Sequence, residues 1–432
     1  MKKLTIILFA LASLSWSCQP TTTETESDSP ASPAIEVDAS IKLPDGFKAA
    51  VVADSVGRAR HLAVRDNGDI YVQLFRTKDN PGLVALRDTD GDVRADVVEK
   101  FGSHEGTGCR IYKDYLYASS DTEIYRYKLQ EDGLLPDEDS KTLIAGGFQE
   151  QRSHAQKAFT FDNEGNMYVG VGAPSNACQT EARTAGSIGI DPCPQLEYGG
   201  GIWRFDAEKP AQTQAKDGFR YATGIRNAIG VTWNPETNSL FAMQHGRDQL
   251  HQLWKDKYTE DEGVELPAEE FYSIQEGDDF GWPYCYYDHL QSKKMLAPEY
   301  GGEGETVGRC EGLKGAIMGF PGHMAPNDLL FYTGDQFPER YKNGAFIAFH
   351  GSWNRAPQEQ KGYFVAFVPM ENGMPSGEWE TFAEGFAGAP AVKSPRDAKH
   401  RPCGLAQGPD GSIYVTDDVK GKIWKIMFEE AI

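Results

Sequence analysis

A repeated strand motif, turn residues before most of its copies, and a composition rich in glycine and tyrosine predict an all-β protein built as a six-bladed β-propeller. The motif is an apolar residue, an aromatic residue and another apolar residue, and it occurs at Ile70–Val72, Leu116–Ala118, Met167–Val169, Leu240–Ala242, Phe346–Ala348 and Ile413–Val415. The 432 residues include 46 Gly and 19 Tyr, which favours many short strands joined by tight turns.

Each copy of the motif is interpreted as one strand of a hairpin. Turn sequences such as Asp66-Asn67-Gly68 and Pro409-Asp410-Gly411 precede most copies. A second alternating run follows each copy, at 83–86, 123–127, 201–205, 249–254, 363–368 and 422–426. Hairpins are the simplest interpretation of these pairs of runs. Six hairpins with further strands between them fit the blades of a closed ring, which protects the sheet edges.

The spacing of the copies predicts one domain over residues 41–432. The widest interval, between the fourth and fifth copies, predicts a long insertion over 255–331. We expect Phe47–Ala53 to pair beside the last copy, because a propeller usually closes with strands from both chain ends. Two stacked β domains are the alternative, but no linker-like segment interrupts the chain after Ile41.

The N-terminal 40 residues are predicted to lie outside the domain. Residues 1–17 have a lysine-containing start and a short apolar run from Leu4 to Leu14, which is typical of a signal peptide. Cys18 follows in a context that resembles a bacterial lipobox, although ordinary cleavage stays an alternative. Residues 18–40 are predicted to be a disordered tether, because they offer little to bury. We therefore expect export and a lipid anchor at Cys18 as the sole membrane contact, facing the periplasm or the cell surface.

Charge and cysteine content narrow the possible partners and the compartment. The formal net charge of −21 argues against a nucleic-acid partner, since phosphates repel an anionic surface. Six cysteines besides Cys18 in an exported chain predict disulfides. Short loops favour pairing Cys178 with Cys193 and Cys285 with Cys310, which leaves Cys109 for Cys403.

Polar clusters lie in predicted loops beside the blade hairpins. They are Ser153-His154, Gly224–Asn227, His245–Asp248, His350–Arg355 and His400–Pro402. Imidazoles accept protons near neutral pH, and arginines that converge on one pocket indicate an anionic, carboxylate-bearing ligand. The alternative is that each arginine forms a structural ion pair with one of the many acidic residues.

Five ordered segments resemble the soluble pyrroloquinoline quinone (PQQ)-dependent sugar dehydrogenases, and most of all their sorbosone and aldose dehydrogenase branch. The segments are RSHAQKAFTFDNEGNMYVGVG from Arg152, YATGIRNAIGVTWNP from Tyr221, DDFGWPYC from Asp278, FIAFHGSWNR from Phe346 and RPCGLAQGPDGSIYVTDD from Arg401. The resemblance extends from Leu43 to Ile426. It implies a six-bladed propeller, in agreement with the repeat count.

The resemblance also implies roles for individual residues. His154 matches the general base that takes the sugar hydroxyl proton while a hydride passes to the quinone; Ser153 stands where the family usually has an aspartate. The implied cofactor contacts are Arg226, Asn227, Arg355, Arg401 and His104. Cys403 replaces a second family arginine. Ca²⁺ is implied at the backbone carbonyls of Gly246 and Arg247, with Asp248 nearby; oxygen ligands suit this ion.

A second calcium candidate is the acidic stretch from Asp88 to Glu99. Its carboxylates follow the spacing of an EF-hand loop, although Val93 occupies the position of the usual glycine. No flanking helices are evident, so a turn stabilised by aspartate side chains is an equally good interpretation.

These observations predict a PQQ- and Ca²⁺-dependent oxidoreductase that oxidises an aldose or sorbosone-like sugar. It would pass electrons to a separate acceptor such as a cytochrome or a quinone. One alternative is a calcium-dependent lactonase on the same fold, which would need acidic and Asn ligands from several blades. Another is a binding propeller without catalysis, for which Ser153 and Cys403 are the motivating departures.

Overall fold

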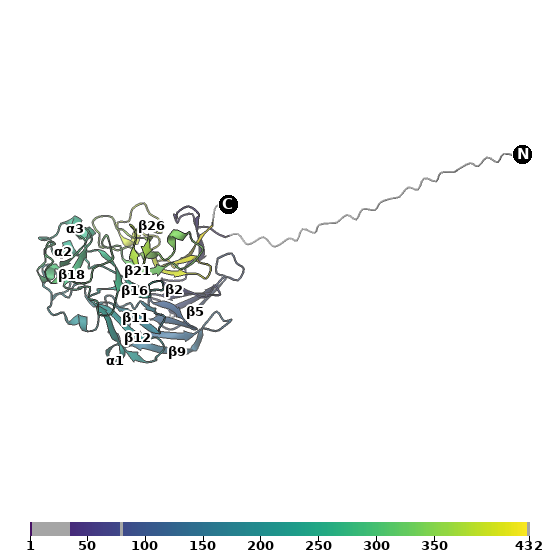
Figure 1. The fold of residues 1–432 in the computed structure, drawn as a ribbon, viewed down its shortest axis with the longest axis horizontal. Helices are drawn as coiled ribbons and strands as arrows, with labels where there is room; N and C mark the ends of the chain where they lie inside the picture. The colour runs from purple at the N-terminus through teal and green to yellow at the C-terminus, as the bar shows by residue number, and fades with distance from the viewer. Residues whose placement is uncertain (2–34, 78–80, 430–432) are drawn as a thin grey trace.

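Six sheets form the blades of a β-propeller, as the repeat predicts, and their strands pair antiparallel except for one short parallel pair in the second blade (Figure 1). This computed structural model describes Met1, residues 35–77 and residues 81–429. The first blade is β2–β5 (Ala59–Val64, Ile70–Leu74, Leu83–Arg87, Val97–Phe101), and the second is β6–β9 (Cys109–Tyr112, Tyr115–Ser119, Ile124–Lys128, Asp137–Gly146) with β13 (Gln212–Thr213). The third is β10–β12 and β14 (Phe159–Phe161, Asn166–Val171, Gly201–Asp206, Phe219–Thr223). The fourth is β15–β17 and β20 (Ala228–Asn234, Ser239–Gln244, Glu269–Ile274, Met318–Phe320), and the fifth is β21–β23 and β26 (Pro326–Phe331, Ala345–Phe349, Phe364–Val368, Glu380–Ala383).

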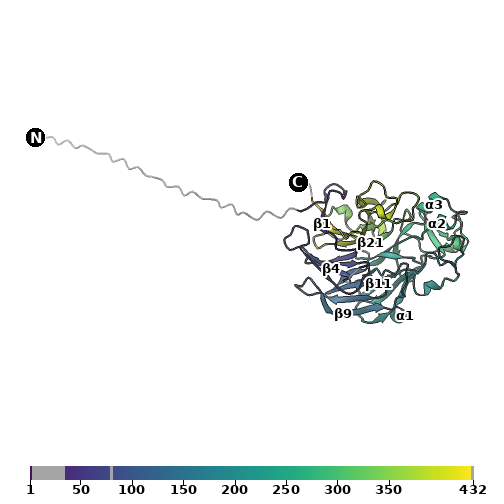
Figure 2. The ribbon, with the colours of Figure 1, turned by 180° about the vertical axis from the view of Figure 1, so that it is seen from behind.

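The sixth blade closes the ring with strands from both ends of the chain, as expected. It consists of β27–β29 (Pro402–Gln407, Ile413–Asp417, Ile423–Phe428) and β1 (Phe47–Ala53). β1 runs antiparallel to β29 from the Phe47–Phe428 pair onward and lies beside the C-terminal strands (Figure 2). The Asp38 carboxylate accepts hydrogen bonds from Lys422 Nζ at 2.8 Å and Trp424 Nε1 at 3.0 Å. Contacts with the domain therefore begin before the predicted boundary at residue 41, whereas the predicted signal peptide and Cys18 lie outside the described residues.

Apolar side chains fill the spaces between neighbouring blades. The largest cluster joins the fifth and sixth blades and contains the fully buried Phe346, Phe386 and Trp424. Burial of each such side chain stabilises the fold by about 1.5–3 kcal/mol. The blades thus form a rigid wall around the axis, and the loops between strands remain at the two ends of the ring.

The interval between the fourth and fifth copies differs from the prediction. The run at 249–254 does not pair with the fourth copy, since its centre is the short helix α2 (Leu250–Leu253); β17 pairs with β16 instead. The predicted insertion at 255–331 therefore includes the blade strands β17, β20 and β21. Its non-blade part contains α3 (Glu260–Glu265) and the hairpin of β18 (Cys285–Asp288) and β19 (Lys293–Leu296).

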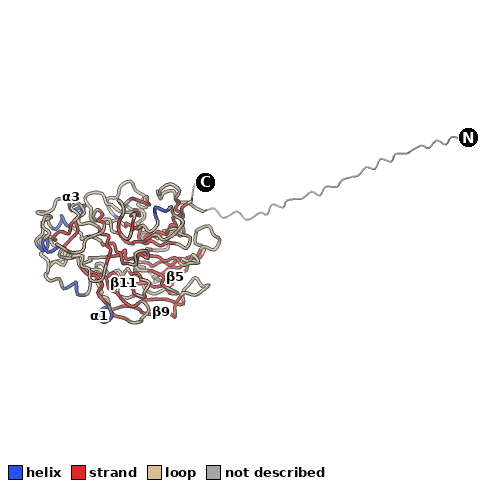
Figure 3. Tube along the Cα trace, in the orientation of Figure 1, coloured by secondary structure: helices blue, strands red, loops and turns tan. Residues whose placement is uncertain are grey.

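Helices are short and peripheral in the part of the chain that the structure describes. Figure 3 shows strands through the body of the molecule and helices such as α1 (Gln214–Asp217) and α3 at its edge. Within the described ranges, no helix has the length and apolar character needed to cross a bilayer.

Two of the three predicted disulfides are confirmed. Cys178 is bonded to Cys193 and Cys285 to Cys310, and both bonds tie loops outside the blade sheets. The predicted Cys109–Cys403 bond is wrong, because both thiols are free and buried. They stand on β6 and β27, and β2 packs against both of these strands. An intervening blade thus separates the two thiols, and the ring is closed by strand pairing rather than by a disulfide.

Alkylation should distinguish the buried free thiols from the disulfide-bonded cysteines. In the native protein we expect neither Cys109 nor Cys403 to react, since both are fully buried and burial raises the pKa of each thiol to about 12. Both should react in denaturant, whereas the four bonded cysteines should react only after reduction. Peptide mass spectrometry measures each site, and rapid native labelling of Cys109 or Cys403 would contradict the buried placement.

Candidate active site

A pocket of about 280 Å³ lies where loops from five blades meet. Its lining includes Arg60 of the first blade, His154 before the third, Arg226 and Asn227 before the fourth, His350 after β22 of the fifth and Arg401 before the sixth. Gly246 and Asp248 also line it. The structure thus brings together six of the nine residues predicted for the site, although they are distributed over 248 positions of sequence from 154 to 401.

His154 faces this pocket with one ring nitrogen already engaged. Its Nδ1 lies 2.6 Å from the carbonyl oxygen of Ala173, so we assign a proton to Nδ1 and leave Nε2 as an acceptor. The chain passes so close at Gly172 that a Cβ there would lie 2.5 Å from the His154 Cβ. Burial, followed by the charge of Arg226, lowers the pKa of His154 to about 3. The imidazole is therefore neutral near pH 7, and in the described chain its Nε2 lone pair accepts no hydrogen bond.

Ser153 gives no side-chain support to the His154 ring. The amide of Gln151 instead organises this segment, since its Nε2 donates to the carbonyls of Ser153, His154 and Gly172 at 2.8–3.0 Å. Among the described residues, the backbone carbonyl of Ala173 is the group that orients the His154 ring.

Arg226 is the most completely bound cation of the pocket. Its Nη2 lies 3.0 Å from Asp248 Oδ2, and its Nη1 donates to the Gly246 carbonyl at 3.0 Å. Asp248 also pairs with Arg183 at 2.7 Å. Burial alone would raise the pKa of Asp248, but the two guanidinium groups lower it below its ordinary range. Asp248 is therefore a carboxylate, and Asn227 Oδ1, next to Arg226, is buried without a hydrogen-bond partner in the described chain.

Arg60 is a pocket residue that the sequence reasoning missed. Its side chain is buried, and its Nη1 lies 2.9 Å from Asp418 Oδ2. Arg60 stands at the beginning of the inner strand β2, which corresponds to the places of Arg226 before β15 and Arg401 before β27. Alignment of the blades by their inner strands would have revealed it.

Three predicted residues lie outside the pocket lining. Arg355 Nη1 donates to the carbonyls of Val264 and Gly322 at 2.8 Å, and its Nη2 pairs with Glu265. The Arg247 guanidinium contacts both carboxylate oxygens of Glu299 at 2.7 Å, so only its backbone remains a candidate ligand.

His104 packs against two tyrosine side chains of the second blade. Its ring centroid is 4.7 Å from that of Tyr125 and 6.3 Å from that of Tyr127. Its role in cofactor binding stays a prediction without support from the lining of this pocket.

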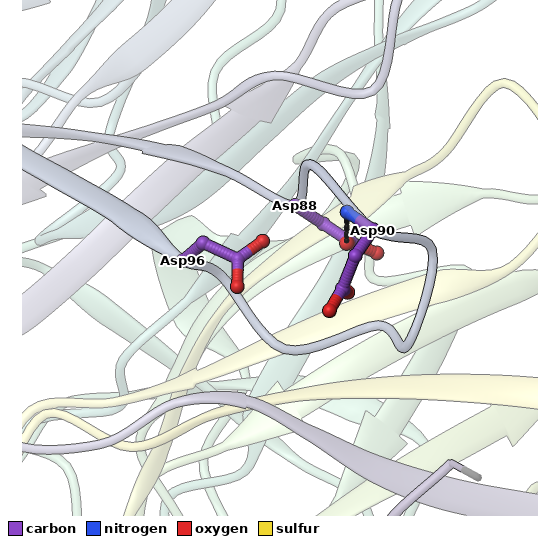
Figure 4. Close-up of side chains that lie close together, drawn as sticks. All are labelled: Asp88, Asp90 and Asp96. Atoms are coloured by element: carbon purple, nitrogen blue, oxygen red, sulfur yellow. Dashed lines mark hydrogen bonds between the residues drawn. The ribbon is translucent and has the colours of Figure 1, made fainter. Parts of the chain in front are cut away.

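The acidic stretch forms an exposed turn over residues 88–96, whereas its last carboxylate, Glu99, lies in strand β5. Oxygen atoms of Asp88, Asp90 and Asp96 lie within 4.8 Å of one another (Figure 4). They also accept hydrogen bonds from their own loop, such as Gly91 N to Asp88 Oδ1 at 2.7 Å and Thr89 N to Asp96 Oδ2 at 2.7 Å. These hydrogen bonds show that the aspartate side chains stabilise the turn. Calcium binding here stays a prediction.

Acid should destabilise the protein through its buried imidazoles. Burial lowers the pKa of His61 and His245 to about 4 and that of His154 to about 3, against about 6.5 in an unfolded chain. Since the unfolded chain binds protons first, this contribution to the free energy of unfolding is complete above about pH 6.5 and is lost toward pH 4. Burial also raises the pKa of Glu269 to about 7 and raises that of Asp121, which acts in the opposite sense, but these are two groups against three imidazoles. We expect Tm to fall steadily from pH 6.5 to pH 4 in calorimetry; a constant Tm would contradict neutral buried imidazoles.

Comparisons with known proteins identify the family of the chain and relatives that share its fold. The family model described as TrAA12-like matches residues 41–429. A Hypocrea jecorina protein described as a PQQ-dependent sugar dehydrogenase is 22% identical over 400 residues, which cover 87% of this chain and 84% of that protein.

Two solved structures share the fold at low sequence identity. A calcium structure of a Trichoderma reesei enzyme of carbohydrate-active family AA12 has a TM-score of 0.73 and 17% identity, covering 93% of this chain and all of that one. The holo form of the PQQ domain of Coprinopsis cinerea pyranose dehydrogenase has a TM-score of 0.71 and 18% identity, covering 92% of this chain and 99% of that one.

Proposed function

Since the chain belongs to the TrAA12-like family, whose relatives are PQQ-dependent sugar dehydrogenases, we propose that it oxidises an aldose or sorbosone-like sugar with PQQ and Ca²⁺. The observation that carries the proposal is the convergence of three guanidinium groups and a neutral imidazole on one axial pocket. Electrons would then pass to a separate acceptor.

The pocket residues fit a polyanionic cofactor. Arg60, Arg226 and Arg401 line the pocket, and their fixed charges would hold the carboxylates of PQQ. The unpartnered Asn227 Oδ1 offers an acceptor to a donor group of a ligand. When bound, PQQ supplies a quinone carbonyl that accepts a hydride, and nearby guanidinium groups stabilise the negative charge that develops.

Oxygen atoms on one wall of the pocket support the calcium proposal. The Gly246 carbonyl accepts one hydrogen bond from Arg226 and keeps a second lone pair, and Asp248 Oδ1 accepts none in the described chain. Carbonyl and carboxylate oxygens are the ligands that Ca²⁺ prefers. We propose that Gly246, Arg247 through its backbone carbonyl, and Asp248 hold the ion.

His154 is proposed as the general base. Its Nε2 would accept the proton of the sugar hydroxyl as the neighbouring C–H bond gives up its hydride. The hydrogen bond from Nδ1 to the Ala173 carbonyl fixes the ring orientation and tautomer that this role requires.

Reconstitution tests the proposal directly. The purified protein mixed with PQQ and Ca²⁺ should show a saturable change in quinone absorbance and should reduce an artificial dye when aldoses are added. Omission of PQQ is the control. Absence of both the absorbance change and dye reduction across a broad sugar panel would reject it, and lactone hydrolysis without PQQ would support a hydrolase instead.

We also propose export and lipid anchoring through Cys18, on the basis of the sequence up to that residue. In a bacterial host, labelled fatty acid should be incorporated into the wild-type protein and be absent from the Cys18→Ser variant. Equal labelling of both proteins would reject the anchor at this residue.

A further inference from the structure

Four imidazoles line the axial pocket, and they differ in how their ring nitrogens are engaged. His245 and His323 have hydrogen-bond partners at both nitrogens. His154 and His350 each have a partner at one nitrogen only within the described chain. These two rings are therefore the ones that can receive a proton from the pocket without loss of an existing hydrogen bond.

His350 forms a carboxylate–imidazole pair with Asp418. Its Nε2 lies 2.6 Å from Asp418 Oδ1, and the Asp418 side chain is 1% exposed. The other carboxylate oxygen of Asp418 is 2.9 Å from Arg60 Nη1. Burial alone would raise the pKa of Asp418, but His350 and Arg60 lower it far below its ordinary range. Asp418 is thus an anion that assigns the proton of the neutral ring to Nε2 and leaves Nδ1 as an acceptor toward the pocket.

The support for His350 is of a different kind from that for His154. His154 Nδ1 is oriented by a neutral backbone carbonyl, whereas a buried carboxylate faces His350. A carboxylate partner stabilises the imidazolium that forms when a ring takes up a proton. Asp418, from the sixth blade, thus gives His350 of the fifth blade the charged orienting group that Ser153 does not give to His154.

Other charges around His350 limit how long it would hold a proton. Arg60 lines the same pocket, and Arg401 Nε donates to the His350 carbonyl at 3.0 Å. His245 also lies on the pocket wall, and Arg58 contacts Asp418 from outside at 3.5 Å. Burial, together with the charges of Arg401 and Arg60, lowers the pKa of His350, whereas Asp418 opposes this shift. A ring in this setting would hold a proton only transiently.

We propose that His350 Nδ1 is the second proton acceptor of the pocket and that Asp418 is its positioning residue. This rests on the proposed function. Oxidation of a carbinol to a carbonyl releases two electrons and two protons; the electrons leave through the cofactor to the external acceptor. The C–H hydrogen leaves as a hydride, whose two electrons go on to the acceptor and whose hydrogen is then left as the second proton. His154 Nε2 takes the proton of the substrate O–H bond that breaks and then gives it to pocket water, which returns the ring to its neutral form. His350 Nδ1 takes the proton released when the electrons pass to the acceptor, forms an N–H bond and then gives the proton to pocket water.

Half-reaction kinetics separate the two imidazoles. In stopped-flow experiments on the loaded enzyme, His350→Gln should slow reoxidation by the dye by about 100-fold, the lower range for general acid–base groups, and leave reduction by sugar within about twofold. His154→Gln should show the reverse. Asp418→Asn should slow reoxidation in the same way as His350→Gln, but its reduction rate is not compared, because this variant also loses the ion pair with Arg60. A matched control is His400→Gln, since His400 pairs with Asp417 at 2.8 Å but does not line the pocket. Equal effects of His350→Gln and His400→Gln, or unchanged reoxidation in His350→Gln, would overturn the proposal.

A second measurement does not depend on activity or on folding of the variants. In the full chain with ¹⁵N-labelled histidine and no cofactor, we expect the His350 resonances near pH 7 to show a protonated Nε2 and an unprotonated Nδ1. A protonated Nδ1 would overturn the proposal. A chain that binds no PQQ would contradict the proposed function. The ¹⁵N measurement, which needs no cofactor, would still decide which nitrogen of His350 carries the proton.

Discussion

Replacement of His154 by glutamine should lower kcat for sugar oxidation by about 10²–10⁴, the range for loss of a general base. Glutamine keeps a polar side chain of similar reach but does not accept a proton near neutral pH. PQQ affinity should change little, because the described contacts of His154 are with the backbone rather than with the arginines of the pocket. Steady-state kinetics and a PQQ titration by absorbance measure the two quantities.

His251→Gln is the matched control for this prediction. His251 Nδ1 lies 2.7 Å from the carbonyl of Tyr258, a contact of the same type as that of His154, but His251 does not line the pocket. Full activity of His154→Gln would show that another group removes the hydroxyl proton. A comparable loss in His251→Gln would indicate that the effect is structural.

Replacement of Arg226 by methionine should weaken PQQ binding by about 30-fold or more, which corresponds to about 2 kcal/mol. Methionine retains much of the side-chain length but removes the charge that faces the pocket. It also leaves Asp248 with Arg183 as its remaining guanidinium partner. Loss of one partner of a buried ion pair should lower the free energy of unfolding by about 3 kcal/mol.

Arg355→Met separates cofactor binding from stability. Arg355 is as buried as Arg226 and also pairs with a carboxylate, that of Glu265, but its guanidinium lies outside the pocket lining. We expect both variants to have lower Tm values and only Arg226→Met to lose PQQ affinity. Equal loss of affinity in Arg355→Met would restore its predicted role as a cofactor contact.

The ring could be predicted from sequence because its signals are local. Each blade has its own apolar–aromatic–apolar motif, and turn residues precede most copies, so six copies are visible without knowledge of their neighbours. The run at 249–254 fails for the same reason, since an alternating pattern also suits a short helix beside an insertion. Trp254, at the end of this run, donates a hydrogen bond to Glu299, a residue distant in sequence. The structure of the run thus depends on a tertiary contact that a local pattern does not reveal.

Site residues could be predicted where the backbone of a blade places them. Arg226 and Arg401 precede inner strands, so the propeller itself aims them toward the axis. Arg355 follows the strand β22 by six residues in an irregular loop, and its direction depends on carbonyls contributed by the insertion. Sequence order alone does not contain that information, and the same holds for the pairing of His350 with Asp418.

The pairing of β1 with β29 has a consequence for biosynthesis. The sixth blade contains β1 together with β27–β29, so its four-stranded sheet exists only after β29 has been synthesised. Until then, the edge of β1 that later pairs with β29 has unpaired backbone N–H and C=O groups, and such an edge can pair with other chains. A stop codon before Ile423 would leave this edge permanently open, and the truncated product should accumulate as aggregate or be degraded rather than persist as a partly active enzyme.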